Sequence, residues 1–158
     1  MPYNPLIHHR RSVRLNGYDY SQAGAYFVTM LARERACVFV NPVIHQLVAT
    51  CWLELPGRFP SLQLDEWVLM PNHLHGIIVI GCEAGDCPMQ LSAVISLFKS
   101  QTARAANRIR QPQAGQLWQR NYHDHIIRSE RELADVRRYI NDNPAKWELD
   151  ENNPARAR

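Results

Sequence analysis

With 158 residues, of which 46% are hydrophobic and 21% charged, the chain has the length and composition of one globular domain. No apolar run approaches the roughly 20 residues that a membrane-spanning helix needs, and the N-terminus lacks the basic and then apolar pattern of a secretory signal. The net charge is +3. The four cysteines are too few for a disulfide scaffold, which suits a reducing cytoplasm. We therefore expect a soluble cytoplasmic protein with no membrane partner.

The chain begins with an arm, a strand and a helix. Residues 1–17 show no apolar period and are interpreted as a basic N-terminal arm. Branched and aromatic residues predict a first strand over residues 25–31. Asn41 supplies an N-cap for a helix over residues 42–55, whose apolar residues recur at helical spacing until a Pro-Gly pair at 56–57 ends the run.

Two strands and a helix follow. The strands predicted over residues 62–70 and 73–80 are separated only by Pro71-Asn72, which indicates an antiparallel hairpin. An amphipathic helix with a basic polar face is predicted over residues 89–110. Residues 117–128 are rich in aromatic and branched side chains and predict a fourth strand.

The last helix begins at a capping box over residues 129–132 and stops near Asn143-Pro144. The order strand, helix, strand, strand, helix, strand is typical of the ferredoxin-like (split βαβ) arrangement, an α+β fold whose antiparallel sheet carries helices on one face. The other face is left for a ligand or for the last helix. We expect one domain over residues 18–147 and a polar C-terminal tail over residues 148–158 that frays.

Two histidines stand at the start of the third strand. Residues i and i+2 of a strand point to one face, so His73 and His75 lie roughly 6 to 7 Å apart at their backbones, while Leu74 points into a core. Neutral imidazole binds several divalent metals, and such binding should weaken as the pH falls through about 6. Two ligands are too few for a closed site, so a third must come from elsewhere. Ordinary strand histidines are an equally simple interpretation.

Tyr139 and Asn143 are four residues apart on the last helix and therefore share a face, at the margin of its apolar stripe. A phenol and an amide in this position can meet the sheet beside the histidines. A metal ion and a hydroxyl nucleophile are what in-line cleavage of a phosphodiester needs. The alternative is a boundary tyrosine with a hydrated hydroxyl, followed by an asparagine that ends the helix.

Two other pairs compete as metal ligands. His123 and His125 have the same spacing on a predicted strand, so spacing alone does not exclude them. Cys82 and Cys87 suggest a zinc pair. An extended strand would place Cys82 roughly 20 Å or more from His75, which favours free cysteines in apolar settings.

Basic residues are unevenly distributed. Residues 99–138 carry nine Lys or Arg and four acidic residues, whereas residues 36–98 carry one Arg and five acidic residues. Sixteen of the 18 basic residues are arginine, whose planar guanidinium binds phosphate and stacks on bases. Nucleic acid is therefore a candidate partner, although biased codon use would give the same enrichment. The residues predicted to contact DNA lie on the arm and on the second helix: Arg10, Arg11, Arg14, Lys99, Arg104 and Arg108.

Six short motifs occur in order along the chain. They are Gly17-Tyr18-Asp19-Tyr20, Tyr26-Phe27-Val28-Thr29, Trp67 to His75, Leu117-Trp118-Gln119, His125-Ile126-Ile127-Arg128 and Tyr139 to Pro144. Together they resemble the REP-associated tyrosine transposases, a branch of the single-tyrosine HUH transposases, over about residues 10–147. HUH denotes two histidines around a hydrophobic residue, and His73-Leu74-His75 matches it residue for residue.

The resemblance implies a metal-dependent DNA endonuclease and strand transferase that cleaves single-stranded or hairpin DNA. Tyr139 would be the nucleophile, forming a 5′-phosphotyrosine link and leaving a free 3′-hydroxyl. Mg²⁺ or Mn²⁺ would sit on His73, His75 and a third polar ligand, for which Asn143 is our candidate. Repetitive extragenic palindromes are implied as substrate, and the protein is expected to be a monomer or homodimer.

Two other hypotheses stay open at the level of sequence. The same sheet and basic residues can hold structured nucleic acid without cutting it, as βαββαβ RNA-binding domains do. A metal-dependent phosphohydrolase would use the histidines without a covalent tyrosine.

Overall fold

The computed structural model describes residues 24–81, 89–111 and 114–157. Its centre is an antiparallel sheet of four strands in the order β2-β3-β1-β4. The strands are β1 (Gly24–Leu31), β2 (Leu62–Met70), β3 (His73–Ile80) and β4 (His123–Ile127). The helices are α2 (Pro42–Leu53), α3 (Leu55–Arg58), α4 (Leu91–Ile109) and α5 (Glu130–Asp142).

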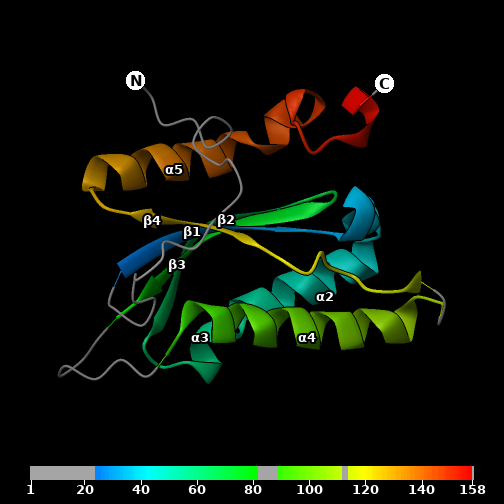
Figure 1. The fold of residues 1–158 in the computed structure, drawn as a ribbon, viewed down its shortest axis with the longest axis horizontal. Coiled ribbons are helices and arrows are strands. Elements are labelled where there is room, and N and C mark those ends of the chain that lie inside the picture. The colour runs from blue at the N-terminus through cyan, green and yellow to red at the C-terminus, as the bar shows by residue number, and fades with distance from the viewer. Residues whose placement is uncertain (1–23, 82–88, 112–113, 158) are drawn as a thin grey trace.

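Helices cover both faces of this sheet (Figure 1). The α2 and α4 helices lie on one face and α5 lies on the other. The structure confirms the predicted ferredoxin-like order, with the last helix placed on the face that the other two leave open. Across the described ranges, no helix combines the length and apolarity needed to cross a membrane.

The helix starts follow from local sequence. The Asn41 side chain accepts hydrogen bonds from the backbone N–H groups of Val43 and Ile44, which caps α2. The Ser129 hydroxyl accepts from the Glu132 N–H at the start of α5, as the capping box predicted. Both caps pair N–H groups that the first turn of a helix leaves without an intrahelical partner.

The strand predicted over residues 117–128 was wrong in its first half, because β4 begins only at His123. The Lys99 ammonium donates to the carbonyl oxygens of Gln119 and Asn121, at 2.8 and 2.9 Å. These carbonyl groups are thus paired with a side chain from α4. Before β4, Trp118 forms an isolated antiparallel β-bridge with Ala32, the residue that follows β1.

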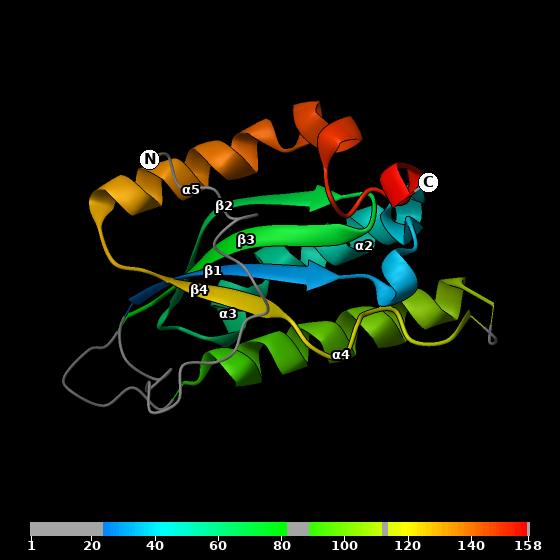
Figure 2. The ribbon, with the colours of Figure 1, turned by 45° about the horizontal axis from the view of Figure 1, so that its top comes forward.

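Smaller elements differ from the prediction as well. The Pro-Gly pair at 56–57 does not end the helical region but lies inside α3. Residues 148–158 were expected to fray, yet the described part forms short 3-10 helices at Pro144–Leu149 and Pro154–Ala157. This segment turns back over the β2–β3 hairpin (Figure 2), where the Asn72 side chain donates to the Asn152 carbonyl oxygen at 2.7 Å.

Strand β3 separates two apolar layers. Leu74 and Ile78 point to the main core between the sheet and α2 and α4. Ile77 points to a smaller core under α5, with Phe27 and Val136. His73 and His75 share the parity of Ile77, so both histidines face α5.

Gly76 marks the closest approach between β3 and α2. A Cβ atom at this position would lie 2.5 Å from Cζ2 of Trp52, which is fully buried. Only glycine therefore lets the indole lie against the strand immediately after His75.

We predict that Gly76→Ala lowers the free energy of unfolding by about 1 to 3 kcal/mol, because the added methyl group overpacks the core. Urea denaturation followed by tryptophan fluorescence measures the change. Gly57→Ala is the matched control, since an added Cβ there meets nothing within 4 Å. Equal stability of the Gly76→Ala protein and the wild type would show that the Trp52 contact does not constrain this position.

Candidate functional site

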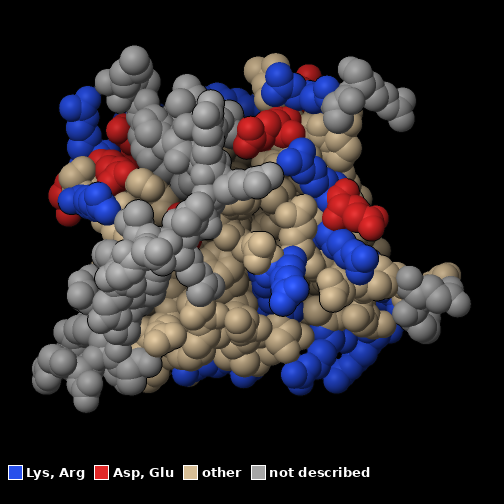
Figure 3. Space-filling view, viewed as in Figure 1, with Lys and Arg blue, Asp and Glu red and all other residues tan. Residues whose placement is uncertain are grey.

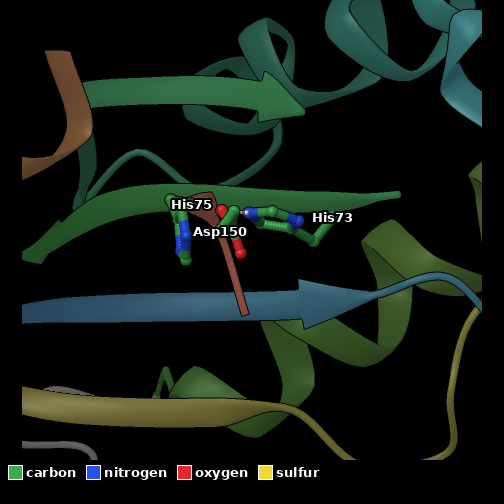
Figure 4. A group of neighbouring side chains, drawn as sticks. All are labelled: His73, His75 and Asp150. Atoms are coloured by element: carbon green, nitrogen blue, oxygen red, sulfur yellow. Dashed lines mark ion pairs between the residues drawn. The ribbon is translucent and has the colours of Figure 1, made fainter. Parts of the chain in front are cut away.

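His73, His75 and Asp150 form a buried group under α5. The imidazole rings lie 4.5 Å apart between centroids, and one ligand atom from each of the three side chains lies within 4.8 Å of the others. Figure 4 shows the Asp150 carboxylate between the two rings. Two nitrogen donors and one carboxylate oxygen at this separation can converge on one metal ion after small side-chain rotations.

The orientation of His73 is set by Asn72. The Asn72 amide nitrogen donates to the backbone oxygens of Arg35 and Asn152, at 2.9 and 2.7 Å, so its side-chain oxygen must face the ring. His73 Nδ1 therefore donates to Asn72 Oδ1, at 2.8 Å. In the neutral ring this leaves the lone pair on Nε2, which lies 3.5 Å from Asp150 Oδ2.

His75 is oriented by β1. Thr29 lies opposite His75 in the β1–β3 register, and its hydroxyl oxygen is 2.8 Å from His75 Nδ1. Both histidines thus use Nδ1 for a hydrogen bond, His73 with the turn before β3 and His75 with β1. Such bonds are typical of metal-binding histidines, whose second nitrogen faces the ion.

Burial keeps His73 neutral. The side chain is fully buried, and this desolvation lowers its pKa to about 4 despite the opposing effect of the Asp150 charge. The ring is therefore in the form that binds metal at neutral pH. The buried Nε2 atom has no hydrogen-bond partner among the residues that the structure describes.

Asp150 is the carboxylate that sequence reasoning missed. It lies beyond the predicted domain end at residue 147, is only 7% exposed, and accepts a hydrogen bond from the Asn152 N–H at 2.7 Å. Its position depends on the fold of the C-terminal segment, and no spacing relates it to the histidines. The available signal was one of three acidic residues within residues 148–151, just before the turn-forming run Asn152-Asn153-Pro154.

Tyr139 lies on α5 next to the histidines. Its ring is 5.4 Å from that of His75 and 6.0 Å from that of Phe27, between centroids. Burial raises the pKa of Tyr139 to about 12, a hydrogen bond with the Asn143 side chain opposes this, and the charges of Asp150 and Glu151 add to it. The phenol is thus protonated, and its ionisation is opposed by nearby negative charge.

Asn143 lies directly after α5 and is almost fully buried. Its amide nitrogen donates to the Tyr139 carbonyl oxygen at 3.2 Å. This bond joins Asn143 to the backbone of Tyr139, and the role of Asn143 as a metal ligand stays a prediction.

An ion pair and a hydrogen-bonded contact attach α5 to the opposite edges of the sheet. Arg137 donates two hydrogen bonds to the Asp65 carboxylate on β2, at 2.7 and 2.6 Å. Glu132 contacts His125 on β4 and also accepts from the Arg128 N–H. Since β2 and β4 are the two edge strands, α5 is held across the full width of the sheet.

The structure describes one of the two competing pairs, His123 and His125, on β4. His125 is engaged with Glu132, and the described residues that can form a metal-binding group are His73, His75 and Asp150. Cys82 and Cys87 lie outside the described residues.

Three of the six residues predicted to contact DNA lie in the described part of the chain. Lys99, Arg104 and Arg108 lie on α4, on the face of the sheet opposite α5. The Lys99 ammonium is half-buried and holds two carbonyl oxygens, whereas Arg104 and Arg108 are exposed. Arg10, Arg11 and Arg14 lie outside the described residues.

Two solved transposase structures have the same fold as this chain. A solved REP-associated tyrosine transposase bound to a REP hairpin superposes with a TM-score of 0.66 at 23% identity, covering 82% of this chain and 72% of that one. A candidate transposase from Deinococcus radiodurans superposes with a TM-score of 0.54 at 21% identity, covering 80% and 93%. At these identities the match concerns the fold alone.

The sequence comparisons concern relatives and family. An uncharacterised protein of Haemophilus influenzae is 38% identical over 94% of this chain and 96% of its own length. A candidate REP-associated tyrosine transposase of the same organism is 22% identical, over 81% of this chain and 74% of its length. The family described as transposase IS200-like matches residues 21–143. The chain is therefore a member of the IS200-like transposase family.

Proposed function

We propose that this protein is a metal-dependent DNA endonuclease and strand transferase that cleaves single-stranded or hairpin DNA through a 5′-phosphotyrosine intermediate. The observation that carries the proposal is the meeting of Tyr139 with His73, His75 and Asp150 under α5. The structural relative bound to a REP hairpin supports hairpin DNA as the substrate class.

The donor set fits a divalent cation. His73 is buried and neutral, its Nε2 atom faces Asp150, and Asn72 holds the ring in that orientation. Two imidazole nitrogens suit Mn²⁺ better than Mg²⁺, which prefers oxygen ligands. A bound ion would supply a positive charge that stabilises negative charge developing on the phosphate. Asn143 stays a candidate for a further ligand position through its side-chain oxygen.

Tyr139 supplies the nucleophile in this proposal. Its hydroxyl oxygen forms a bond to the phosphorus atom while the bond from phosphorus to the 3′ oxygen breaks, and the phenol proton leaves for solvent or for that oxygen. The contacts of Arg137 with Asp65 and of Glu132 with His125 hold α5 so that the phenol stays beside His75. The phosphodiester energy is kept in the tyrosine–DNA link, which permits later strand transfer.

We predict that Asp150→Asn weakens Mn²⁺ binding by at least about tenfold, the size of effect that removing supporting groups of metal sites typically has. Isothermal titration calorimetry on metal-free protein measures the affinity. Asn143→Ala is the comparison, and we expect a smaller loss. If Asn143→Ala abolishes binding while Asp150→Asn leaves it intact, the third ligand is Asn143 and Asp150 is not a ligand.

We predict that the pH dependence of metal binding reflects the lowered pKa of the buried His73 side chain. Because its pKa lies at about 4, protonation of this ring competes with the ion only well below the pH of about 6 expected for an exposed histidine. Lowering the pH therefore weakens Mn²⁺ binding through His73 as the pH falls through about 4. Calorimetric titrations across this pH range test whether the Mn²⁺ affinity falls on acidification. If His73→Gln lowers the affinity as much as acid does, the acid effect is assigned to protonation of His73. A wild-type affinity that rises on acidification would contradict this assignment.

Tyr139→Phe should abolish the covalent adduct and DNA nicking together, because it removes the attacking oxygen and keeps the ring that packs on Phe27. DNA affinity should be nearly unchanged. Denaturing gels of labelled hairpin DNA incubated with Mn²⁺ or Mg²⁺ show the adduct, and mass spectrometry of the DNA-linked peptide locates it.

Tyr122→Phe is the control and should leave the adduct intact, since Tyr122 packs against the main core with Lys99 over its ring. Nicking that survives Tyr139→Phe would indicate hydrolysis by water. An adduct on another tyrosine would show that Tyr139 is not the nucleophile.

A further inference from the structure

The chain has only two lysines, and they lie in opposite settings. Lys146 is exposed, and its Nζ atom lies 3.2 Å from a carboxylate oxygen of Asp142. Lys99 lies on α4 and is half-buried, and its Nζ atom donates to the carbonyl oxygens of Gln119 and Asn121. The two amines can therefore be compared within one protein, one held by the fold and one in solvent.

Lys99 lines a groove at the molecular surface. This groove has a volume of about 680 Å³ and is lined by one side of α4, by Arg33 and by residues 115–120. We call it the α4 groove. Figures 1 and 2 show that the segment between α4 and β4 runs back alongside the helix and forms the second wall. A small molecule in the groove can therefore reach the side chain of Lys99.

The α4 groove attracts anions. Arg33 and Arg120 line it together with Lys99, and no acidic residue among the described ones does. The stretch from residue 87 to residue 123 contains no Asp or Glu and five Lys or Arg. In Figure 3, blue side chains gather along the lower edge of the molecule, over α4, with no red among them. Because guanidinium groups bind phosphate, small molecules that carry phosphate are expected to gather beside Lys99.

The Lys99 amine is partly uncharged at neutral pH. Burial lowers its pKa to about 8, so about one tenth of the molecules carry the free amine at pH 7. A lysine with the ordinary pKa of about 10.4 has roughly 0.04% in this form. Only the free amine has a lone pair with which to attack a carbonyl carbon.

The charged and titratable groups around Nζ come from several elements. Arg33 follows β1 and Arg120 lies in the second wall of the groove. On the segment that leads into β4, the centroid of the Tyr122 ring lies 5.8 Å from Nζ. At the start of β4, the pKa of His123 is lowered by burial and, to a smaller extent, by the Lys99 charge. Among the described residues, no carboxylate raises the pKa of Lys99.

The hydrogen bonds of Lys99 suit the free amine as well as the ammonium. A free amine has two N–H groups, and the carbonyl oxygens of Gln119 and Asn121, at 2.8 and 2.9 Å, accept one each. The lone pair then occupies a tetrahedral position of the nitrogen that neither carbonyl group uses. Loss of one proton therefore leaves both hydrogen bonds intact and keeps the nucleophile in a fixed place.

We propose that Lys99 is an acylation site, which takes its acyl group from a small donor that carries phosphate, such as an acyl phosphate or an acyl thioester of coenzyme A. A bond forms between Nζ and the acyl carbon, while the bond from that carbon to the phosphate oxygen or thioester sulfur breaks. The leaving group takes the bonding electrons, and one amine proton passes to it or to solvent. Arg33 and Arg120 hold the phosphate of the donor. This inference does not depend on the proposed DNA cleavage.

Acylation would release a segment that Lys99 holds. The acylated nitrogen is an uncharged amide with a single N–H, so it can donate to only one of the two carbonyl oxygens. Residues 119–121 lead into β4, and His125 on that strand contacts Glu132 on α5. One short segment thus connects the modified side chain to the helix that carries Tyr139.

The first test follows acylation of both lysines in the wild type by peptide mass spectrometry. Three donors are compared: acetyl phosphate, acetyl coenzyme A, and N-acetoxysuccinimide, which has no phosphate. With a phosphate-bearing donor at pH 7, Lys99 should react at least about tenfold faster than Lys146, because more of it is free amine. Its rate should level off above a pH of about 8. A preference seen with one of the two phosphate donors identifies the acyl source, and a Lys99 rate no higher than that of Lys146 with both donors would overturn the site.

The second test concerns the phosphate contact. The double variant Arg33→Ala, Arg120→Ala should slow acylation of Lys99 by the phosphate-bearing donors at least about tenfold, and leave the rate with N-acetoxysuccinimide nearly unchanged. The matched control is Arg58→Ala, Arg138→Ala, which removes the same charge from exposed positions on α3 and α5 and should change neither rate. Equal slowing by both variants would show that only net charge matters and would overturn the role of the groove.

Hydrogen exchange tests the structural consequence. In a Lys146→Arg protein, Lys99 is the only lysine, and its acetylation should speed exchange of the Gln119 N–H, which donates to the Leu31 carbonyl oxygen at 2.8 Å. We expect roughly fivefold faster exchange, the factor that corresponds to one lost hydrogen bond. A Lys99→Arg protein treated in the same way is the control and should show no change. Unchanged exchange after complete acetylation of Lys99 would overturn the release of residues 119–121.

Discussion

The geometry of the His73, His75 and Asp150 group depends on the side-chain amide of Asn72. This fully buried group donates to the backbone oxygens of Arg35 and Asn152 and accepts from His73 Nδ1. One side chain thus joins the turn after β1, the start of β3 and the segment after α5. Leaving any of these buried polar groups without a partner would cost about 1 to 3 kcal/mol. The bonds that hold these three segments together are therefore also those that aim the imidazole.

Without a bound metal ion, the surroundings under α5 disfavour the charged forms of both His73 and Tyr139. Burial keeps His73 neutral and Tyr139 protonated, while Asp150 adds a negative charge that disfavours a phenolate further. A divalent cation beside these groups would act on each in a useful direction, since it binds neutral imidazole, pairs with the carboxylate and offsets the charge that opposes phenol ionisation. In the proposed reaction, metal binding and ionisation of the Tyr139 phenol would therefore be coupled through the same buried charges.

Local sequence patterns correctly predicted the features that depend on neighbouring residues, such as strand faces and helix starts. The alternation of a strand placed His73 and His75 on one face, and the Ser129 capping box marked the start of α5. Asp150 could not be predicted in this way, because its contact with His73 exists only once the C-terminal segment has folded over the hairpin. The strand expected from residue 117 failed for a similar reason. Strand propensity does not reveal that Lys99, a residue of α4, takes the carbonyl groups of Gln119 and Asn121.

The attachment of α5 to both edges of its own sheet brings all the groups of the candidate site together within one chain. Asp65 on β2 and His125 on β4 hold the helix at opposite sides, and Tyr139 lies between these contacts. Histidines, carboxylate and phenol are consequently supplied by one polypeptide. Catalysis would then scale linearly with protein concentration, and mixing a chain that lacks the histidines with one that lacks the tyrosine would not restore activity.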